Sequence, residues 1–206
     1  MLELDHVMCL VPPDGNAPAR LEAAGWRLDA GTVHAGQGTR NRRLPWSGQY
    51  LELLWIADLD EAQRAPLRLD RRADRARSGA SPFGFGFRGS LPPALRDDYW
   101  RYDGLPMPVW VHRDDERAPE RPLVFVLDFS GLERSLTGRD RGGKPAEPAA
   151  GRLRAVRHTG PQPAPLPPYD GPVIESAPGP HRLELTVDGG PAGGRVVVTD
   201  WLAVTG

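Results

Sequence analysis

The chain has 206 residues, 39% of them hydrophobic, which is enough for the core of one sizeable domain or of two small modules. Its 26 basic and 27 acidic residues give a net charge of −1, so no basic surface that would bind nucleic acid is expected. Cys9 is the only cysteine, which excludes an intrachain disulfide, and no apolar run approaches the roughly 20 residues of a membrane helix. We therefore expect a cytoplasmic protein with no nucleic-acid or membrane partner.

The first 57 residues predict the element order β-α-β-β-β. Residues 2–11 alternate as a strand with apolar residues on both faces, as an interior strand has, and His6 interrupts one of those faces. Asn16 can begin a short helix. The elements expected after the first strand are a helix over residues 17–24 and strands over residues 26–33, 37–46 and 49–57.

The rest of the chain predicts a connector and more strands. Residues 58–80 are strongly charged and predict a helical connector that is interrupted near Pro66. Residues 81–130 predict a second, degenerate unit of the same kind, in which a short PPALRDD stretch stands in place of the helix. Residues 131–151 have the composition of a linker, and residues 152–206 predict a β-rich C-terminal segment. The individual strands are expected over residues 83–89, 99–103, 107–113, 123–129, 153–159, 182–187 and 195–204.

Two glycine-rich stretches match nucleotide-binding patterns only in part. GFGFRG at residues 84–89 fits G-x-G-x-x-G, but two prolines follow where a helix should open to receive a pyrophosphate. GRDRGGKP at residues 138–145 fits G-x-x-x-x-G-K, but a proline stands where Ser or Thr should bind magnesium. We interpret the second stretch as linker. The first is expected to be a strand with one aromatic and one bare face, and the bare face favours close packing or ligand contact.

His6 and Glu52 are polar residues on apolar strand faces. Glu52 shares its face with Tyr50 and Leu54, and a lone buried carboxylate is costly unless it neutralises or finds a partner. Both misfits are explained if the two side chains meet. A meeting of imidazole and carboxylate allows two interpretations: a hydrogen bond that satisfies both groups, or a shared metal ion.

The stretches LDHVMCLV, GTRN and YLELLWI resemble the glyoxalase-like proteins of the vicinal oxygen chelate superfamily. The resemblance is good over residues 2–57 and weaker over residues 81–129. It implies an α+β fold of paired β-α-β-β-β modules, which curl into half-barrels around a substrate cleft. It also implies that His6 and Glu52 occupy the metal-ligand positions of the first module, and that the cofactor of metal-dependent members is a divalent ion.

The second module departs from the family pattern. Its first strand, PFGFGFRG, carries no ligand residue, and its last strand, PLVFVLDF, carries only Asp128. His34, His112 and Asp128 are the remaining candidates for a third ligand. Some members of the superfamily bind hydrophobic ligands without a metal, so the resemblance leaves both kinds of site open.

Two functions therefore remain open. The first is metal-assisted lyase, isomerase or dioxygenase chemistry on a small oxygenated molecule, or, without a metal, catalysis by Glu52 as a general base. The second is a metal-free module that binds or sequesters a small molecule. Asn41 is a candidate to hold an anionic or carbonyl group of the ligand, and Phe85 is a candidate for the pocket wall. Phe83, Phe87, Trp46 and Trp55 could line the same pocket, and a homodimer is a further expectation.

Overall fold

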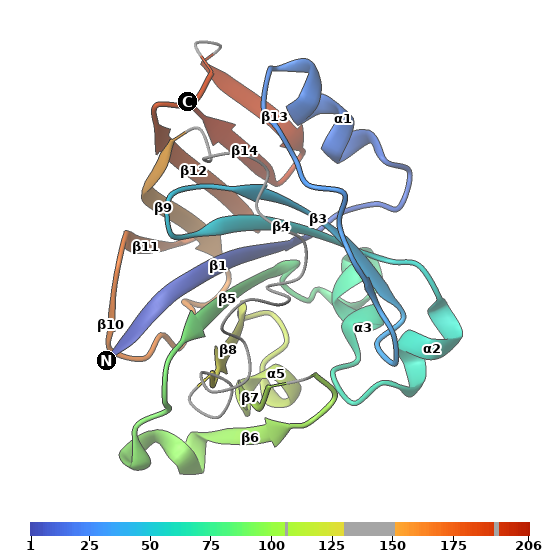
Figure 1. The fold of residues 1–206 in the computed structure, drawn as a ribbon. Helices are drawn as coiled ribbons and strands as arrows, with labels where there is room; N and C mark the ends of the chain where they lie inside the picture. The colour runs from blue at the N-terminus through green and yellow to red at the C-terminus, as the bar shows by residue number, and fades with distance from the viewer. Residues whose placement is uncertain (106, 130–150, 192–193) are drawn as a thin grey trace.

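The structure is a computed structural model that describes residues 1–105, 107–129, 151–191 and 194–206. It has the predicted α+β class, with short helices and with most strands in two sheets (Figure 1). The predicted linker over residues 131–151, with the GRDRGGKP stretch, lies outside the described residues except for Gly151. In the part of the chain that the structure describes, no helix is long and apolar enough to cross a membrane.

The larger sheet contains the strands of the first 129 residues. Within the described residues it has nine strands. One of them, β10 (Tyr169–Asp170), lies outside the linear strand order and pairs with the start of β1. The other eight follow in the order β2 (Val33–His34), β3 (Thr39–Pro45), β4 (Tyr50–Ile56), β1 (Leu2–Leu10), β5 (Phe83–Arg88), β8 (Leu123–Leu127), β7 (Val109–His112) and β6 (Tyr99–Tyr102).

This strand order is symmetric about the pair β1 and β5. Those two strands are antiparallel, while β1 runs parallel to β4 and β5 runs parallel to β8. Antiparallel neighbours then continue outward on each side, β3 and β2 on one and β7 and β6 on the other. Two units with the order β-α-β-β-β produce this pattern. In the second unit the PPALRDD stretch forms only the short 3-10 helix η1 (Pro93–Asp98).

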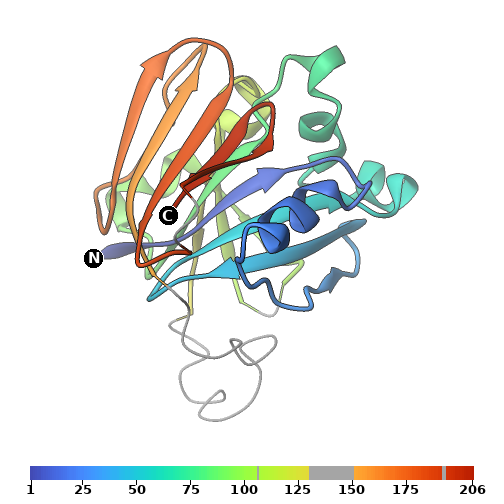
Figure 2. The same ribbon diagram turned by 90° about the horizontal axis from the view of Figure 1, so that it is seen from above.

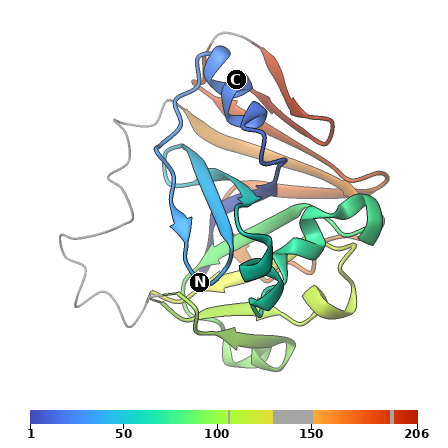
Figure 3. The ribbon, with the colours of Figure 1, turned by 90° about the vertical axis from the view of Figure 1, so that its right-hand side faces the viewer.

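The helices lie at the edges of the sheets. Helix α1 (Asn16–Ala23) packs beside the C-terminal strands (Figure 3), where Arg20 donates a hydrogen bond to the carbonyl oxygen of Val198. The charged connector forms α2 (Leu59–Arg64), α3 (Leu69–Ala73) and α4 (Arg75–Ser78), with the predicted interruption around Pro66. A further short helix, α5 (Asp114–Arg117), precedes β8.

The smaller sheet contains the C-terminal segment. Its order is β11 (Val173–Pro178), β9 (Arg152–Gly160), β12 (Arg182–Asp188), β14 (Leu202–Thr205) and β13 (Arg195–Thr199). The single strand expected over residues 195–204 is wrong, because the chain turns at Asp200 and Trp201 and returns as a second strand. Strand β11 was not expected from the sequence at all.

The strand expected over residues 26–33 is also wrong, since only Val33 and His34 of this region are in a strand. Asp29 explains the difference. Its carboxylate accepts hydrogen bonds from the backbone N–H groups of Gly31 and Arg43, at 3.0 and 2.8 Å. The segment is therefore held as a loop against β3, because an Asp side chain can replace a strand neighbour as the partner of backbone donors.

The two faces of the larger sheet have different surroundings. We call the face that carries Val7 and Phe85 the outer face and the face that carries His6 and Glu52 the inner face. The smaller sheet covers the outer face as a second layer (Figure 2), and the two sheets share one apolar core. The inner face has its own apolar cluster, completed by Leu69 of the connector. The members of that cluster are Met8, Leu10, Leu54, Leu69, Tyr102, Val109, Val111, Leu123, Phe125 and Leu127.

Candidate functional site

A β-bulge in β1 brings two polar side chains to the inner face. The register between β1 and β5 shifts between Leu4 and His6, so Asp5 has no partner on β5. Leu4 consequently lies with the outer-face core, although regular alternation along residues 2–11 would place it on the same face as His6. Asp5 and His6 instead point toward each other, and Asp5 Oδ2 lies 2.8 Å from His6 Nδ1.

His6 is almost completely buried, with 3% of its surface exposed. The ring of Tyr50 stacks on its imidazole at 4.5 Å between centroids, and the ring of Phe125 lies 5.2 Å away at a tilt. Gly86 of β5 makes room for this arrangement. A Cβ atom at Gly86 would lie only 2.5 Å from His6 Cε1 and 2.9 Å from Phe125 Cε2. The bare face expected for the GFGFRG strand is thus the place where the histidine packs.

Glu52 meets His6 from β4. Its Oε2 atom lies 3.6 Å from His6 Nε2, and its Oε1 atom accepts a 2.6 Å hydrogen bond from the side-chain amide of Asn41. The orientation of that amide is unambiguous, because Asn41 Oδ1 accepts from the backbone N–H of Thr32 at 2.7 Å. Asn41 therefore holds one oxygen of Glu52 and leaves the other directed at His6.

The loop before β3 supports Asn41. His34 Nε2 lies 3.3 Å from the amide nitrogen of Asn41, and His34 Nδ1 lies 3.0 Å from the hydroxyl of Thr39. The loop itself is held by Glu61, whose carboxylate accepts from the backbone N–H groups of Gly36 and Gly38. Gly38 has φ +66°, and a Cβ there would lie 2.2 Å from the carbonyl oxygen of Asp58. Only glycine allows this loop to approach the connector so closely.

The charges around His6 favour its protonated form. Burial by itself would lower the pKa of His6, but the hydrogen bond to Asp5 and the negative charges of Glu52 and Asp5 outweigh burial and raise that pKa. Burial likewise would raise the pKa of Asp5, yet the bond to His6 and the charges of His6 and Arg88 lower it. Asp5 is thus a carboxylate that keeps a proton on His6 Nδ1. The pKa of Tyr50 is well above its ordinary value, because its hydroxyl is buried and lies near Glu52 and Asp5.

The donor atoms do not fit a resident metal ion. Catalytic zinc sites use three protein ligands. In residues 1–105, 107–129, 151–191 and 194–206, no group of three or more His, Cys, Asp or Glu side chains could hold an ion. Asp5 binds the far nitrogen of His6, so among the described residues only His6 and Glu52 offer atoms to a common point. His34, His112 and Asp128 do not complete a ligand set with them.

Phe85 does not lie with the other candidate residues. Its alternation with Gly84 and Gly86 places it on the outer face, where it is fully buried and packs edge-on against His158 of the smaller sheet. Phe83, Phe87 and Trp46 belong to the same core. The structure therefore contradicts a pocket wall built from this aromatic row, because the C-terminal sheet has already covered it.

Sequence reasoning missed Asp5 and the stacking role of Tyr50. The motif LDHV places an acid beside the histidine, but regular alternation assigns the two side chains to opposite faces. Only the bulge, which depends on how β1 pairs with β5, brings them together. Tyr50 lies directly opposite His6 in the parallel register of β1 and β4, and this pairing was not predicted from the sequence.

Comparison with known proteins agrees with this architecture. Residues 4–102 match the family model described as a glyoxalase-like domain. A hypothetical protein from Staphylococcus aureus has 10% sequence identity and a TM-score of 0.57, with 99% of this chain and 98% of that chain covered. Methylmalonyl-CoA epimerase from Mycobacterium tuberculosis has 18% identity and a TM-score of 0.40, with 61% and 87% covered. No curated protein matches the sequence.

The family match begins in β1 and extends through the connector into the second half of the larger sheet. It includes both His6 and Glu52, and the similar S. aureus structure shows that the whole architecture, the C-terminal sheet included, occurs in another protein. Over residues 4–102 the chain is therefore similar to glyoxalase-like domains.

Proposed function

We propose that the inner face of the larger sheet is an acid–base site for a small oxygenated molecule, with Glu52 as the general base and His6 as the proton donor. The observation that carries this proposal is the 3.6 Å approach of His6 Nε2 and Glu52 Oε2 on the face that also carries an apolar cluster. A buried carboxylate and a buried imidazole are costly in such surroundings, and a residue pair that served packing alone would be served better by apolar side chains.

The contacts assign a role to each atom. Asp5 occupies His6 Nδ1, which leaves Nε2–H to donate to a substrate carbonyl oxygen. Asn41 occupies Glu52 Oε1, which leaves Oε2 to accept a proton from the carbon next to that carbonyl. The C–H bond breaks, its electron pair forms a C=C bond, and the carbonyl electrons move to the oxygen that His6 stabilises. Return of a proton to carbon completes an isomerisation or an exchange. Asp5 and Asn41 are positioning residues.

The alternative is a metal-free binding module. The observation that favours it is the apolar cluster on the same face, with Met8, Leu54 and Phe125 around the polar pair. In this reading His6, Glu52, Asp5 and Asn41 satisfy one another, and a ligand makes mainly apolar contacts.

Deuterium exchange separates the two functions. The protein is incubated in D2O with a panel of 2-oxo acids and hydroxyketones, and proton NMR follows loss of the signal next to the carbonyl. We expect exchange above background with at least one compound, a loss of at least 100-fold in Glu52→Gln, and no change in the control Glu184→Gln, which alters a partly exposed carboxylate in β12 of the smaller sheet. Exchange that persists in Glu52→Gln contradicts the general base.

A thermal-shift screen with a metabolite panel, with and without added divalent ions, tests the alternative. If no compound exchanges, and a ligand stabilises the protein equally in wild type, His6→Ala and Glu52→Ala, the acid–base function is wrong and the binding module stands. Stabilisation that requires a divalent ion and vanishes in His6→Ala would show that metal and ligand together complete the site.

A further inference from the structure

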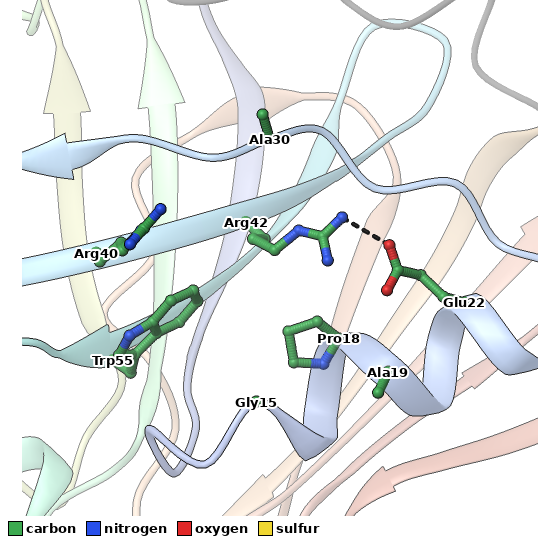
Figure 4. Close-up of a pocket in the computed structure, with 8 residues that line it drawn as sticks. All are labelled: Gly15, Pro18, Ala19, Glu22, Ala30, Arg40, Arg42 and Trp55. Atoms are coloured by element: carbon green, nitrogen blue, oxygen red, sulfur yellow. Dashed lines mark hydrogen bonds and ion pairs between the residues drawn. The ribbon is translucent and has the colours of Figure 1, made fainter.

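A pocket lies on the side of β3 opposite to Asn41 and Glu52. Arg40 and Arg42 point to the outer face, whereas Asn41 between them points to the inner face. The pocket has a volume of about 240 Å³ and lies between these arginines and helix α1 (Figure 4). Trp55 of β4 forms one wall, directly opposite Arg40 in the strand register, and Pro18 and Glu22 of α1 form another.

The two arginines differ in their bonding. Arg42 is fixed, since its Nε donates to the carbonyl oxygen of Asp29 at 2.9 Å and its terminal nitrogen donates to Glu22 at 2.6 Å. Arg40 is exposed and makes no hydrogen bond or ion pair with any residue that the structure describes. The Arg40 guanidinium, whose donors have no partner among the described residues, therefore lies at the rim of the pocket, next to an indole ring.

We propose that this pocket binds a small planar carboxylate, such as an aromatic acid. A guanidinium and a carboxylate form two parallel hydrogen bonds, and the face of a tryptophan accepts a flat ring. The volume is below the roughly 300–1,000 Å³ of pockets for drug-sized ligands, so the ligand must be small.

The charged side chains that line the pocket favour a ligand with one negative charge over a ligand with two. Arg40 and Arg42 contribute two positive charges and Glu22 one negative charge to the lining. The start of α1 offers little to a phosphate, because its Asn16 N–H already donates to the carboxylate of Asp14 and that carboxylate would repel a dianion. The pocket is separate from the inner-face site, and its ligand does not contact His6 or Glu52.

The test is a titration of the full chain with benzoate, followed by NMR at the Trp55 indole N–H. We expect saturable shifts of that signal, and binding at least tenfold weaker in Arg40→Gln. In Trp55→Leu, which lacks that signal, isothermal titration calorimetry should likewise show binding at least tenfold weaker than in wild type. The matched control is Arg27→Gln, which removes an exposed arginine outside the pocket and should bind as wild type does. Glu52→Gln should also bind benzoate normally.

Benzamide and inorganic phosphate complete the design. Benzamide has the ring without the charge, and phosphate has charge without the ring, so both should bind at least tenfold more weakly than benzoate. Absence of any benzoate shift, equal binding by Arg40→Gln, or phosphate binding as tight as benzoate binding would overturn the proposal. Because Arg40 is exposed, its replacement leaves the fold intact, and a loss of binding cannot be ascribed to unfolding.

Discussion

Asp5 and His6 are neighbours in sequence, yet Asp5 Oδ2 lies 2.8 Å from His6 Nδ1 because a bulge turns both side chains to the same face of the sheet. The contact is local, but its effect reaches Glu52, since it decides which nitrogen of the imidazole faces that carboxylate. Asp5 thereby sets both the proton affinity and the orientation of His6.

Replacing Asp5 by Asn should lower the pKa of His6. The raised pKa of His6 depends on the hydrogen bond and the charge of Asp5, and an amide keeps the shape but not the charge. NMR titration of the imidazole signals measures the change, with His112 in the same spectra as an internal control. A His6 pKa that does not move in Asp5→Asn would contradict the role assigned to Asp5.

The same contact predicts how stability depends on pH. Because the folded state raises the pKa of His6, its contribution to the free energy of unfolding is fully present at low pH. That contribution is lost as the pH rises from the ordinary value of 6.5 through the raised one. Denaturant unfolding at several pH values in this range should show that the free energy of unfolding of the wild type decreases as the pH rises. The decrease should be smaller in Asp5→Asn.

His158 should make the protein less stable as the pH falls, which is the opposite of the effect of His6. It is completely buried between Phe83 and Phe85, and burial, with the nearby His181, lowers the pKa of His158 from 6.5 to about 4. The folded state therefore loses stability as the pH falls from 6.5 toward 4, by up to about 1.4 kcal/mol per pH unit. In His158→Phe this acid-dependent slope should shrink. The comparison uses the slope of the free energy of unfolding against pH, so any packing cost of the variant that does not depend on pH cancels. An unchanged slope would contradict the prediction.

Gly86→Ala should displace His6. A Cβ there meets the imidazole and the ring of Phe125 within 3 Å, and such overpacking typically costs about 1–3 kcal/mol. Gly84→Ala is the matched control on the same strand and face, because its closest contact is the flexible end of Met8, at 2.8 Å. Urea unfolding of both variants should show the larger loss for Gly86→Ala, together with a shifted His6 imidazole signal. Equal losses would contradict the close fit of His6.

Arg72→Met should strongly destabilise the connector. Arg72 is buried, pairs with Asp115 at 2.7 Å, and also donates to three carbonyl oxygens, so its removal leaves a buried carboxylate without its cation. Breaking a buried pair in this way costs about 3–5 kcal/mol. Arg77→Met, which removes an exposed arginine from the same connector, should leave the unfolding midpoint nearly unchanged. A similar midpoint for the two variants would show that the buried pair contributes little.

Alternation in the sequence identified His6 and Glu52 as polar residues on apolar strand faces, and their meeting was predicted from that shared feature and from the resemblance to glyoxalase-like proteins. The period of two in β4 assigns Glu52 to one face, and the parallel neighbour β1 then places His6 within 3.6 Å of it. The bulge at Asp5 could not be predicted in this way, because it depends on the register between β1 and β5.

Phe85 was expected to form part of a pocket wall, and this expectation failed for a related reason. Its strand was predicted correctly, and so was its alternation with glycine, but the residues that cover the aromatic face begin about 70 positions later in the chain. Local patterns report which residues share a face. They do not report which distant segment covers that face.

The C-terminal layer also has a consequence for synthesis. Strand β1 precedes in the chain, and so is synthesised before, the strands of the smaller sheet that cover its outer face. Trp201 donates from its indole to the carbonyl oxygen of Leu10, across 191 residues of sequence. Contacts of such separation slow folding, and they leave the apolar face of β1 exposed until the strands of the smaller sheet have been synthesised. During translation the outer face of the larger sheet is therefore exposed for a time. We expect chaperones that bind apolar strands to bind this face during that time.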